Sequence, residues 1–249
     1  MKLNEIKDAK YYEGENKETG IILFHAYTGS PNDVNLLARE LNRSGYGVLC
    51  PKFEGHATKD VNDILDADIT TWKQQALDAV EAMQDEYDRI LVFGLSLGGI
   101  FATWLMTQPK LDVQGGGVFN SPVYTENPID VEVHFTSYVK AIFKRFSSED
   151  NYNQEIDGIL TKHRDQMKQL EAFKSEFQGQ LENIDQPFFI AQSGKDEMIN
   201  EKDAKKLQNA LVNAKVDFNW FPENTHVITV NRNRKDFEAA LFDFITSFK

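Results

Sequence analysis

The chain has 249 residues, of which 41% are hydrophobic and 12% aromatic, so it can bury a large core in a single domain. Its formal net charge of -12 would repel nucleic acids and anionic membranes, which argues against a polyanionic partner. Cys50 is the single cysteine, and this excludes an intrachain disulfide and a cysteine zinc site.

The first fifteen residues contain no apolar stretch as long as a signal peptide requires, so we expect a cytoplasmic protein. After them, apolar β-branched runs alternate with amphipathic helical segments. This alternation is typical of βαβ units and predicts an α/β fold, with a mainly parallel sheet flanked by helices on both faces. The six predicted strands are residues 20–27, 45–51, 89–96, 114–121, 187–193 and 216–222.

The first predicted helix begins at Ser30. Pro31 is expected at its first helical position, and Asp33 is expected to close a capping box. Apolar residues then recur at helical spacing, so one face of this helix should be buried. Further helices are predicted over residues 71–84, after Ser96, over 201–214 and over 237–248.

Residues 90–109 carry no charge and are long enough to span a bilayer. Glycines, a serine and threonines interrupt this run, however. A buried parallel strand followed by a buried helix explains it better, because both faces of such a strand are covered in α/β proteins. We therefore expect no stable membrane insertion.

The regular alternation breaks once, between residues 122 and 185. About sixty residues separate two strands there, far more than an ordinary connection needs. Residues 131–146 predict a helix with an aromatic face, and a more charged helical stretch follows to Phe177. We expect a helical cap, 122–185, inserted into one domain, 1–249.

Phe135, Tyr138 and Phe143 lie on the aromatic face of the first cap helix. We expect these rings to roof an acyl pocket and to contact the substrate. The alternative is that they only anchor the cap to the main domain.

The sequence GLSLG, residues 94–98, joins the third predicted strand to a helix. Gly-x-Ser-x-Gly in that position is the nucleophile elbow, a strained turn that lifts a serine hydroxyl out of the sheet. Glycines suit the positions two before and two after the serine, because a side chain there would collide across the bend. Ser96 is the predicted nucleophile.

A serine hydroxyl needs a base to take its proton and a third group to orient that base. With such an elbow the chain order is serine, acid, histidine. Of the five histidines, His226 is the one that follows the last predicted strand, so it is the expected base. Asp196 follows the fifth strand and is the expected acid, with Glu197 as its nearest rival.

The oxyanion that forms when Ser96 attacks a carbonyl needs backbone N–H donors. Leu97, the residue after the nucleophile, is expected to supply one of them. Tyr27, in the loop after the first strand, is expected to supply the other.

Together these segments resemble the α/β-hydrolase family, and within it the small capped bacterial carboxylesterases and monoacylglycerol lipases, over nearly the whole chain. The resemblance implies ester hydrolysis without a cofactor and an acyl pocket beneath the cap. Two residues depart from the family pattern, since Ala26 and Ala57 stand where the family usually has glycine. The matching segments are HAYTGSP, PKFEGHA, GLSLGG, SGKDEMI and ENTHVIT.

We therefore expect a serine carboxylesterase that hydrolyses short- to medium-chain carboxylic esters through an acyl-enzyme on Ser96. A small-molecule ester is the expected partner, and no metal site is expected, because no two histidines share a ligand spacing with a carboxylate or thiolate. The alternatives are another triad hydrolase, such as a thioesterase, monoacylglycerol lipase or amidase, and a noncatalytic small-molecule receptor on a hydrolase scaffold.

Overall fold

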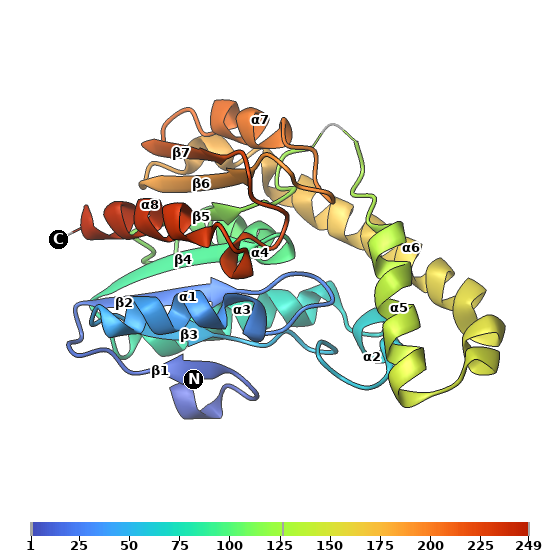
Figure 1. Ribbon diagram of the computed structural model, residues 1–249. Coiled ribbons are helices and arrows are strands. Elements are labelled where there is room, and N and C mark those ends of the chain that lie inside the picture. Colours follow the sequence, from blue (N-terminus) through green and yellow to red (C-terminus); the bar gives the residue numbers. More distant parts are fainter. Residues whose placement is uncertain (1, 126, 249) are drawn as a thin grey trace.

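The structure, a computed structural model, describes residues 2–125 and 127–248. A sheet with the strand order β1-β3-β2-β4-β5-β6-β7 runs through its centre (Figure 1). Strands β2 to β7 are parallel to one another, and β1 pairs antiparallel with β3. The strands are β1 (Lys10–Tyr12), β2 (Thr19–Phe24), β3 (Gly47–Cys50), β4 (Arg89–Leu95), β5 (Gly115–Phe119), β6 (Phe188–Ser193) and β7 (Val216–Phe221).

Helices cover both faces of this sheet, which confirms the predicted α/β architecture. Helices α1 and α8 pack on one face against Ile21 and Leu23, while α3, α4 and α7 belong to the core on the other face with Ile22 and Phe24. The helices are α1 (Asn32–Arg43), α2 (Val61–Leu65), α3 (Ile69–Gln84), α4 (Leu97–Met106), α5 (Glu132–Phe146), α6 (Glu149–Gln178), α7 (Asp203–Ala210) and α8 (Arg234–Thr246). Short 3₁₀ turns span Leu3–Glu5, Leu181–Asn183 and Ile228–Val230.

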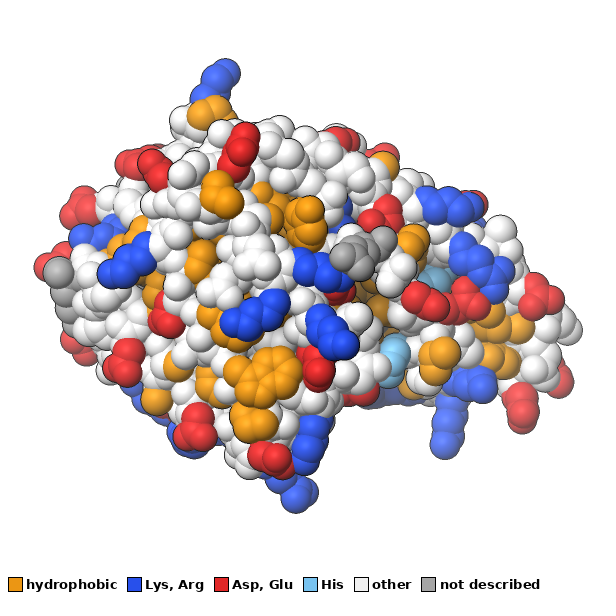
Figure 2. Space-filling model, turned by 90° about the horizontal axis from the view of Figure 1, so that it is seen from above, with side chains coloured by type: hydrophobic (Ala, Val, Ile, Leu, Met, Phe, Trp, Pro, Cys, Tyr) orange, Lys and Arg blue, Asp and Glu red, His pale blue; other side chains and the backbone are white. Residues whose placement is uncertain are grey.

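The uncharged run 90–109 forms β4 and α4, as predicted, and all of α4 is buried. No helix among the described residues is long and apolar enough to cross a membrane. Charged side chains of both signs are interspersed over the face of the molecule that Figure 2 shows.

Helix α1 begins at Asn32, two residues after the predicted start. Of the two contacts of the predicted capping box, the one from Asp33 back to Ser30 is present, whereas Ser30 Oγ contacts the N–H of Asn32 in place of that of Asp33. Ser30 Oγ accepts from the N–H of Asn32 at 3.2 Å, and the Asp33 carboxylate accepts from the N–H of Ser30 at 3.2 Å. These two contacts hold the loop that leads from β2 into α1.

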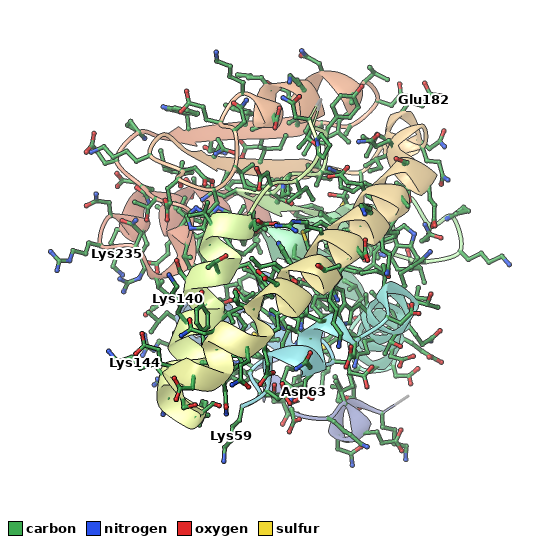
Figure 3. The ribbon with its side chains drawn as sticks, turned by 90° about the vertical axis from the view of Figure 1, so that its right-hand side faces the viewer. Lys59, Asp63, Lys140, Lys144, Glu182 and Lys235 are labelled. Atoms are coloured by element: carbon green, nitrogen blue, oxygen red, sulfur yellow. The ribbon has the colours of Figure 1, made fainter. Side chains whose placement is uncertain are left out.

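Helices α5 and α6 lie between β5 and β6 in the chain, and we call residues 122–185 the cap segment. They cross the carboxyl ends of the parallel strands (Figure 1), and Figure 3 shows them from that side with Lys140 and Lys144 pointing outward. The C-terminal half of α6 is anchored to α4, because the ring of Phe173 packs on Phe101 and Trp104.

Candidate active site

The turn between β4 and α4 holds Ser96 in a strained conformation, with φ at +52°. Its N–H donates to the carbonyl of Phe119 at 2.9 Å, which ties the turn to β5. A side chain at Gly94 would collide with the backbone of Gly98, and one at Gly98 with the backbone of Phe24. The predicted collision across the bend is confirmed for Gly94, whereas Gly98 is required by the close approach of the neighbouring strand β2.

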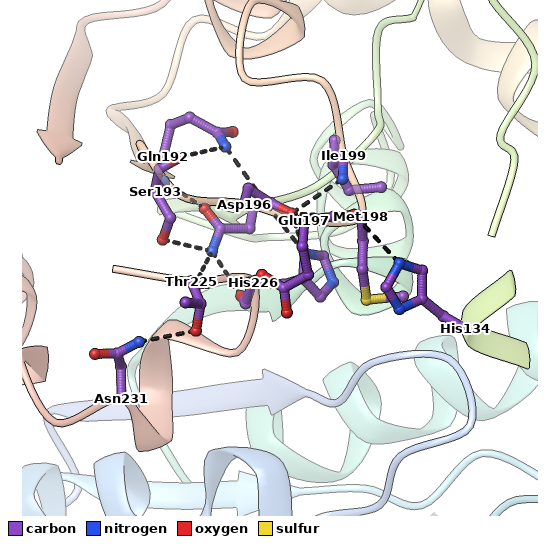
Figure 4. A network of polar contacts seen from close by, with 11 residues as sticks. His134, Gln192, Ser193, Asp196, Glu197, Met198, Ile199, Thr225, His226 and Asn231 are labelled. Atoms are coloured by element: carbon purple, nitrogen blue, oxygen red, sulfur yellow. Dashed lines mark hydrogen bonds and ion pairs between the residues drawn. The ribbon is translucent and has the colours of Figure 1, made fainter. Parts of the chain in front are cut away.

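The loops after β6 and β7 bring an acid and an imidazole together, as Figure 4 shows. His226 Nδ1 lies 2.9 Å and 3.0 Å from the two carboxylate oxygens of Asp196. Asp196 Oδ1 also accepts from the N–H groups of Met198 at 2.9 Å and Ile199 at 3.0 Å. These contacts fix the carboxylate, which in turn fixes the orientation of the imidazole ring.

The second ring nitrogen of His226, Nε2, is buried and has no hydrogen-bond partner among the described residues. His226 and Ser96 line the same cavity, although no hydrogen bond joins their side chains in this structure. Such contacts are often long in the absence of substrate and shorten in the reacting complex. The arrangement leaves Nε2 available to take a proton from within the cavity.

Asn120, at the end of β5, links the loops that carry the acid and the imidazole. Its Nδ2 donates to the carbonyl of His226 at 2.6 Å and to Ser193 Oγ at 2.9 Å, and its Oδ1 accepts from the N–H of Ser193 at 2.7 Å. Asn120 has a φ of +47°, which asparagine tolerates better than most residues. The sequence analysis did not identify this residue, because its partners are far away in the chain.

Glu197, the rival candidate for the acid, contacts the backbone of the histidine loop. Its carboxylate accepts from the N–H of His226 at 3.0 Å, and its carbonyl lies 3.2 Å from Nε2 of His134 on α5. Asp196 therefore contacts the imidazole, and Glu197 supports the loop that carries it.

The two expected oxyanion donors, Tyr27 and Leu97, both line the cavity. Within the described residues, neither backbone N–H has a hydrogen-bond acceptor. The half-buried carboxylate of Asp33 braces the loop around Tyr27, accepting from the N–H of Ser30 at 3.2 Å and more weakly from that of Ala26 at 3.4 Å. Burial raises the pKa of Asp33 to about 6.

The cavity has a volume of about 230 Å³, and most of its wall is apolar. Of the three cap rings expected to contact substrate, Phe135 lines it, whereas Tyr138 and Phe143 do not. Tyr138 packs on Phe135, and Phe143 packs on Tyr152 of α6. Further apolar lining residues are Ile100, Pro122, Ile129, Val131, Met167, Leu170, Met198 and Ile199.

Met167 and Leu170 were not singled out in the sequence, because α6 carries many charged residues. Met167 and Leu170 are three residues apart, so they lie on the same face of the helix. Ile159 and Phe173 are also buried on α6, and this pattern of apolar residues indicates a face that points inward. In the described part of the chain, no cluster of three or more His, Cys, Asp or Glu side chains could hold a metal ion.

Comparisons with known proteins agree with this architecture. A family model described as serine aminopeptidase, S33 matches residues 15–174, well over half of the chain. A carboxylesterase from Bacillus subtilis (strain 168) is 26% identical over 237 residues, which cover 94% of each chain.

Solved structures are similar over nearly the full length. One from work on the metagenome-derived lipolytic enzymes LipS and LipT superposes with a TM-score of 0.75 at 18% identity, covering 98% of each chain. A monoacylglycerol lipase from Paleococcus ferrophilus gives a TM-score of 0.69 at 14% identity, covering 97% of this chain and 98% of that one. These similarities confirm the predicted fold.

Proposed function

Because the chain belongs to the serine aminopeptidase S33 family of α/β-hydrolases, we propose that it is a serine carboxylesterase acting on short- to medium-chain esters. The observation that carries the proposal is the pairing of His226 Nδ1 with Asp196, which leaves Nε2 unpartnered in the cavity that Ser96 also lines. The similarity to the Bacillus subtilis carboxylesterase supports an ester as the substrate.

In the proposed reaction, Ser96 Oγ attacks the carbonyl carbon of the ester while His226 Nε2 takes the hydroxyl proton. Asp196 keeps the proton of the imidazole on Nδ1 and stabilises the imidazolium that forms. The N–H groups of Tyr27 and Leu97 stabilise the negative charge on the carbonyl oxygen. Their lack of other acceptors supports this role.

Collapse of the tetrahedral intermediate breaks the bond to the alcohol, which leaves with the proton that His226 returns to it. The acyl group is then bound to Ser96 as an ester. Water attacks this acyl-enzyme with His226 as the base, and the carboxylic acid is released. The reaction consumes one water and needs no cofactor.

The acyl group would lie against the apolar wall of the cavity, because burying a methylene there stabilises the complex by about 0.8 kcal/mol. The wall combines residues of the main domain, such as Ile100, with residues of the cap segment, such as Leu170.

A panel of p-nitrophenyl esters with acyl chains from two to sixteen carbons tests the proposal, run beside thioester and amide analogues. We expect the highest kcat/KM on short or medium esters. Ser96→Ala should lower kcat by about four to six orders of magnitude with the fold intact, and should not be labelled by a fluorophosphonate. A preference for the thioester or the amide would favour one of the other triad hydrolases, and full activity of Ser96→Ala would exclude Ser96 as the nucleophile.

A further inference from the structure

The side chain of Tyr27 contacts both helices of the cap segment. Its ring stacks on Phe135 of α5 at 5.9 Å and on His163 of α6 at 5.8 Å between ring centroids. Its hydroxyl donates to Gln166 Oε1 at 2.7 Å and lies 3.2 Å from His163 Nδ1. The residue that offers an oxyanion donor through its backbone is thus held by the cap through its side chain.

Gln166 and His163 are buried polar residues one helical turn apart on α6, with 2% and 1% of their surface exposed. Gln166 Nε2 donates to the carbonyl of Ile64 at 2.6 Å and to that of Ala67 at 3.3 Å. Its amide group therefore joins three parts of the chain, namely the loop of Tyr27, helix α6 and the segment around α2. A buried amide with both ends satisfied fixes the groups it contacts, because breaking either bond leaves a polar group unpaired.

The directions of these hydrogen bonds follow from the groups involved. The single hydroxyl proton of Tyr27 goes to Gln166 Oε1, so the short contact with His163 requires Nδ1–H of that ring to donate to the hydroxyl oxygen. Burial lowers the pKa of His163 to about 4, so the ring is neutral at neutral pH and carries one N–H. The hydroxyl of Tyr27 is thus both a donor and an acceptor toward α6.

We propose that the Tyr27 hydroxyl, held by Gln166 and His163, is a positioning group that sets the backbone N–H of Tyr27 for the oxyanion. The inference rests on the proposed function, since it takes that N–H as an oxyanion donor. Met167 and Leu170, next to this contact on α6, line the cavity. Two successive turns of α6, residues 163–170, therefore contact both the acyl wall and the oxyanion loop.

A hydroxyl that positions the oxyanion donor affects the chemical step, whereas a hydroxyl that only anchors the cap affects the stability of the fold. The ground-state ester needs no oxyanion donor, whereas the tetrahedral intermediate does. Loss of a whole donor costs about a hundredfold to a thousandfold in kcat, so a displaced donor should cost about tenfold. KM should change little, because the cavity that binds the acyl chain is retained.

Tyr27→Phe tests the proposal, since it keeps the ring and the backbone donor and removes only the hydroxyl. We expect kcat on p-nitrophenyl butyrate to fall about tenfold with KM within about twofold of the wild type. Affinity for a butyl trifluoromethyl ketone, which forms an oxyanion adduct with Ser96, should fall by a similar factor. Gln166→Met should lower kcat and this affinity in the same direction, and the double variant should lose less kcat than the product of the two single losses, because both changes break the contact between the Tyr27 hydroxyl and Gln166.

Tyr152→Phe is the matched control, because Tyr152 lies on α6 and its hydroxyl makes no hydrogen bond within the described chain. It should leave kcat and inhibitor affinity unchanged. If Tyr27→Phe and Gln166→Met keep wild-type kcat and inhibitor affinity, whatever their melting temperatures, the hydroxyl only anchors the cap and the proposal is wrong. Absence of Ser96-dependent ester hydrolysis in the wild type would instead overturn the proposed function, and this inference with it.

Discussion

Asp196 and Glu197 are neighbours in the chain, yet the first contacts the imidazole of His226 and the second its backbone N–H. Asp196→Asn would present an N–H to Nδ1 and favour the wrong tautomer of the ring, so kcat should fall about ten-thousandfold. Glu197→Gln keeps an oxygen that accepts from the backbone N–H of His226, so kcat should change little. Turnover of p-nitrophenyl acetate by both variants measures the difference. If Glu197→Gln lost activity and Asp196→Asn kept it, Glu197 would be the acid of the triad.

Ala57 stands where the family usually has glycine, and its φ of +56° lies in the left-handed region. That conformation costs a residue with a side chain about 1–2 kcal/mol, while glycine loses about 0.5–1 kcal/mol more chain entropy on folding. Ala57→Gly should therefore raise the free energy of unfolding by about 0.5–1 kcal/mol in urea denaturation.

Ala239→Gly is the control for this measurement, because Ala239 is exposed within helix α8. Glycine in a helix costs about 1 kcal/mol relative to alanine, so this variant should be less stable than the wild type. A loss of stability in Ala57→Gly as well would show that the loop does not strain Ala57.

Ser96, Asp196 and His226 could be chosen from the sequence because each follows a recognisable strand, and their order in the chain limits their roles. Asn120 could not, because its partners Ser193 and His226 lie 73 and 106 residues away. Hydrogen bonds of that range depend on how the loops pack, and no local pattern encodes them.

At the scale of elements, the cap segment gives a prediction about substrate choice. Phe135→Ala and Leu170→Ala enlarge the cavity, so the preferred acyl chain should become longer. Each methylene that the enlarged cavity buries stabilises the complex by about 0.8 kcal/mol. An ester with two more carbons should therefore gain about tenfold in kcat/KM. The measurement is kcat/KM across the ester series.

Phe143→Ala is the matched variant, because Phe143 is buried in the cap segment but does not line this cavity. It should lower the melting temperature and leave the chain-length profile as it is. If both cavity variants behaved like Phe143→Ala, the cap rings would serve only as anchors.

The six parallel strands lie within three residues of their predicted ends, because buried strands read as apolar runs bounded by turns. Strand β1 (Lys10–Tyr12) was missed, since three half-buried residues show no period and depend on pairing with β3. Helix α2 (Val61–Leu65) was missed because five residues are too few to establish a helical repeat.

At the scale of the whole molecule, the groups of the candidate site come from the carboxyl ends of β2, β4, β5, β6 and β7. Ligands bind at this edge of open α/β sheets because the loops there meet. The topology of the sheet could therefore be used to predict the location of the site, while the contacts between its loops required the structure.

The position of His226 after the last strand has a consequence for synthesis of the protein. A chain emerging from the ribosome exposes the segment of Ser96 long before that of His226, which lies 130 residues later (226 − 96). Contacts between such distant segments form late, because closing a long loop costs entropy before the contacts repay it. The nucleophile thus stays without its base until β7 has paired with β6, and a partly made chain would be unable to hydrolyse esters.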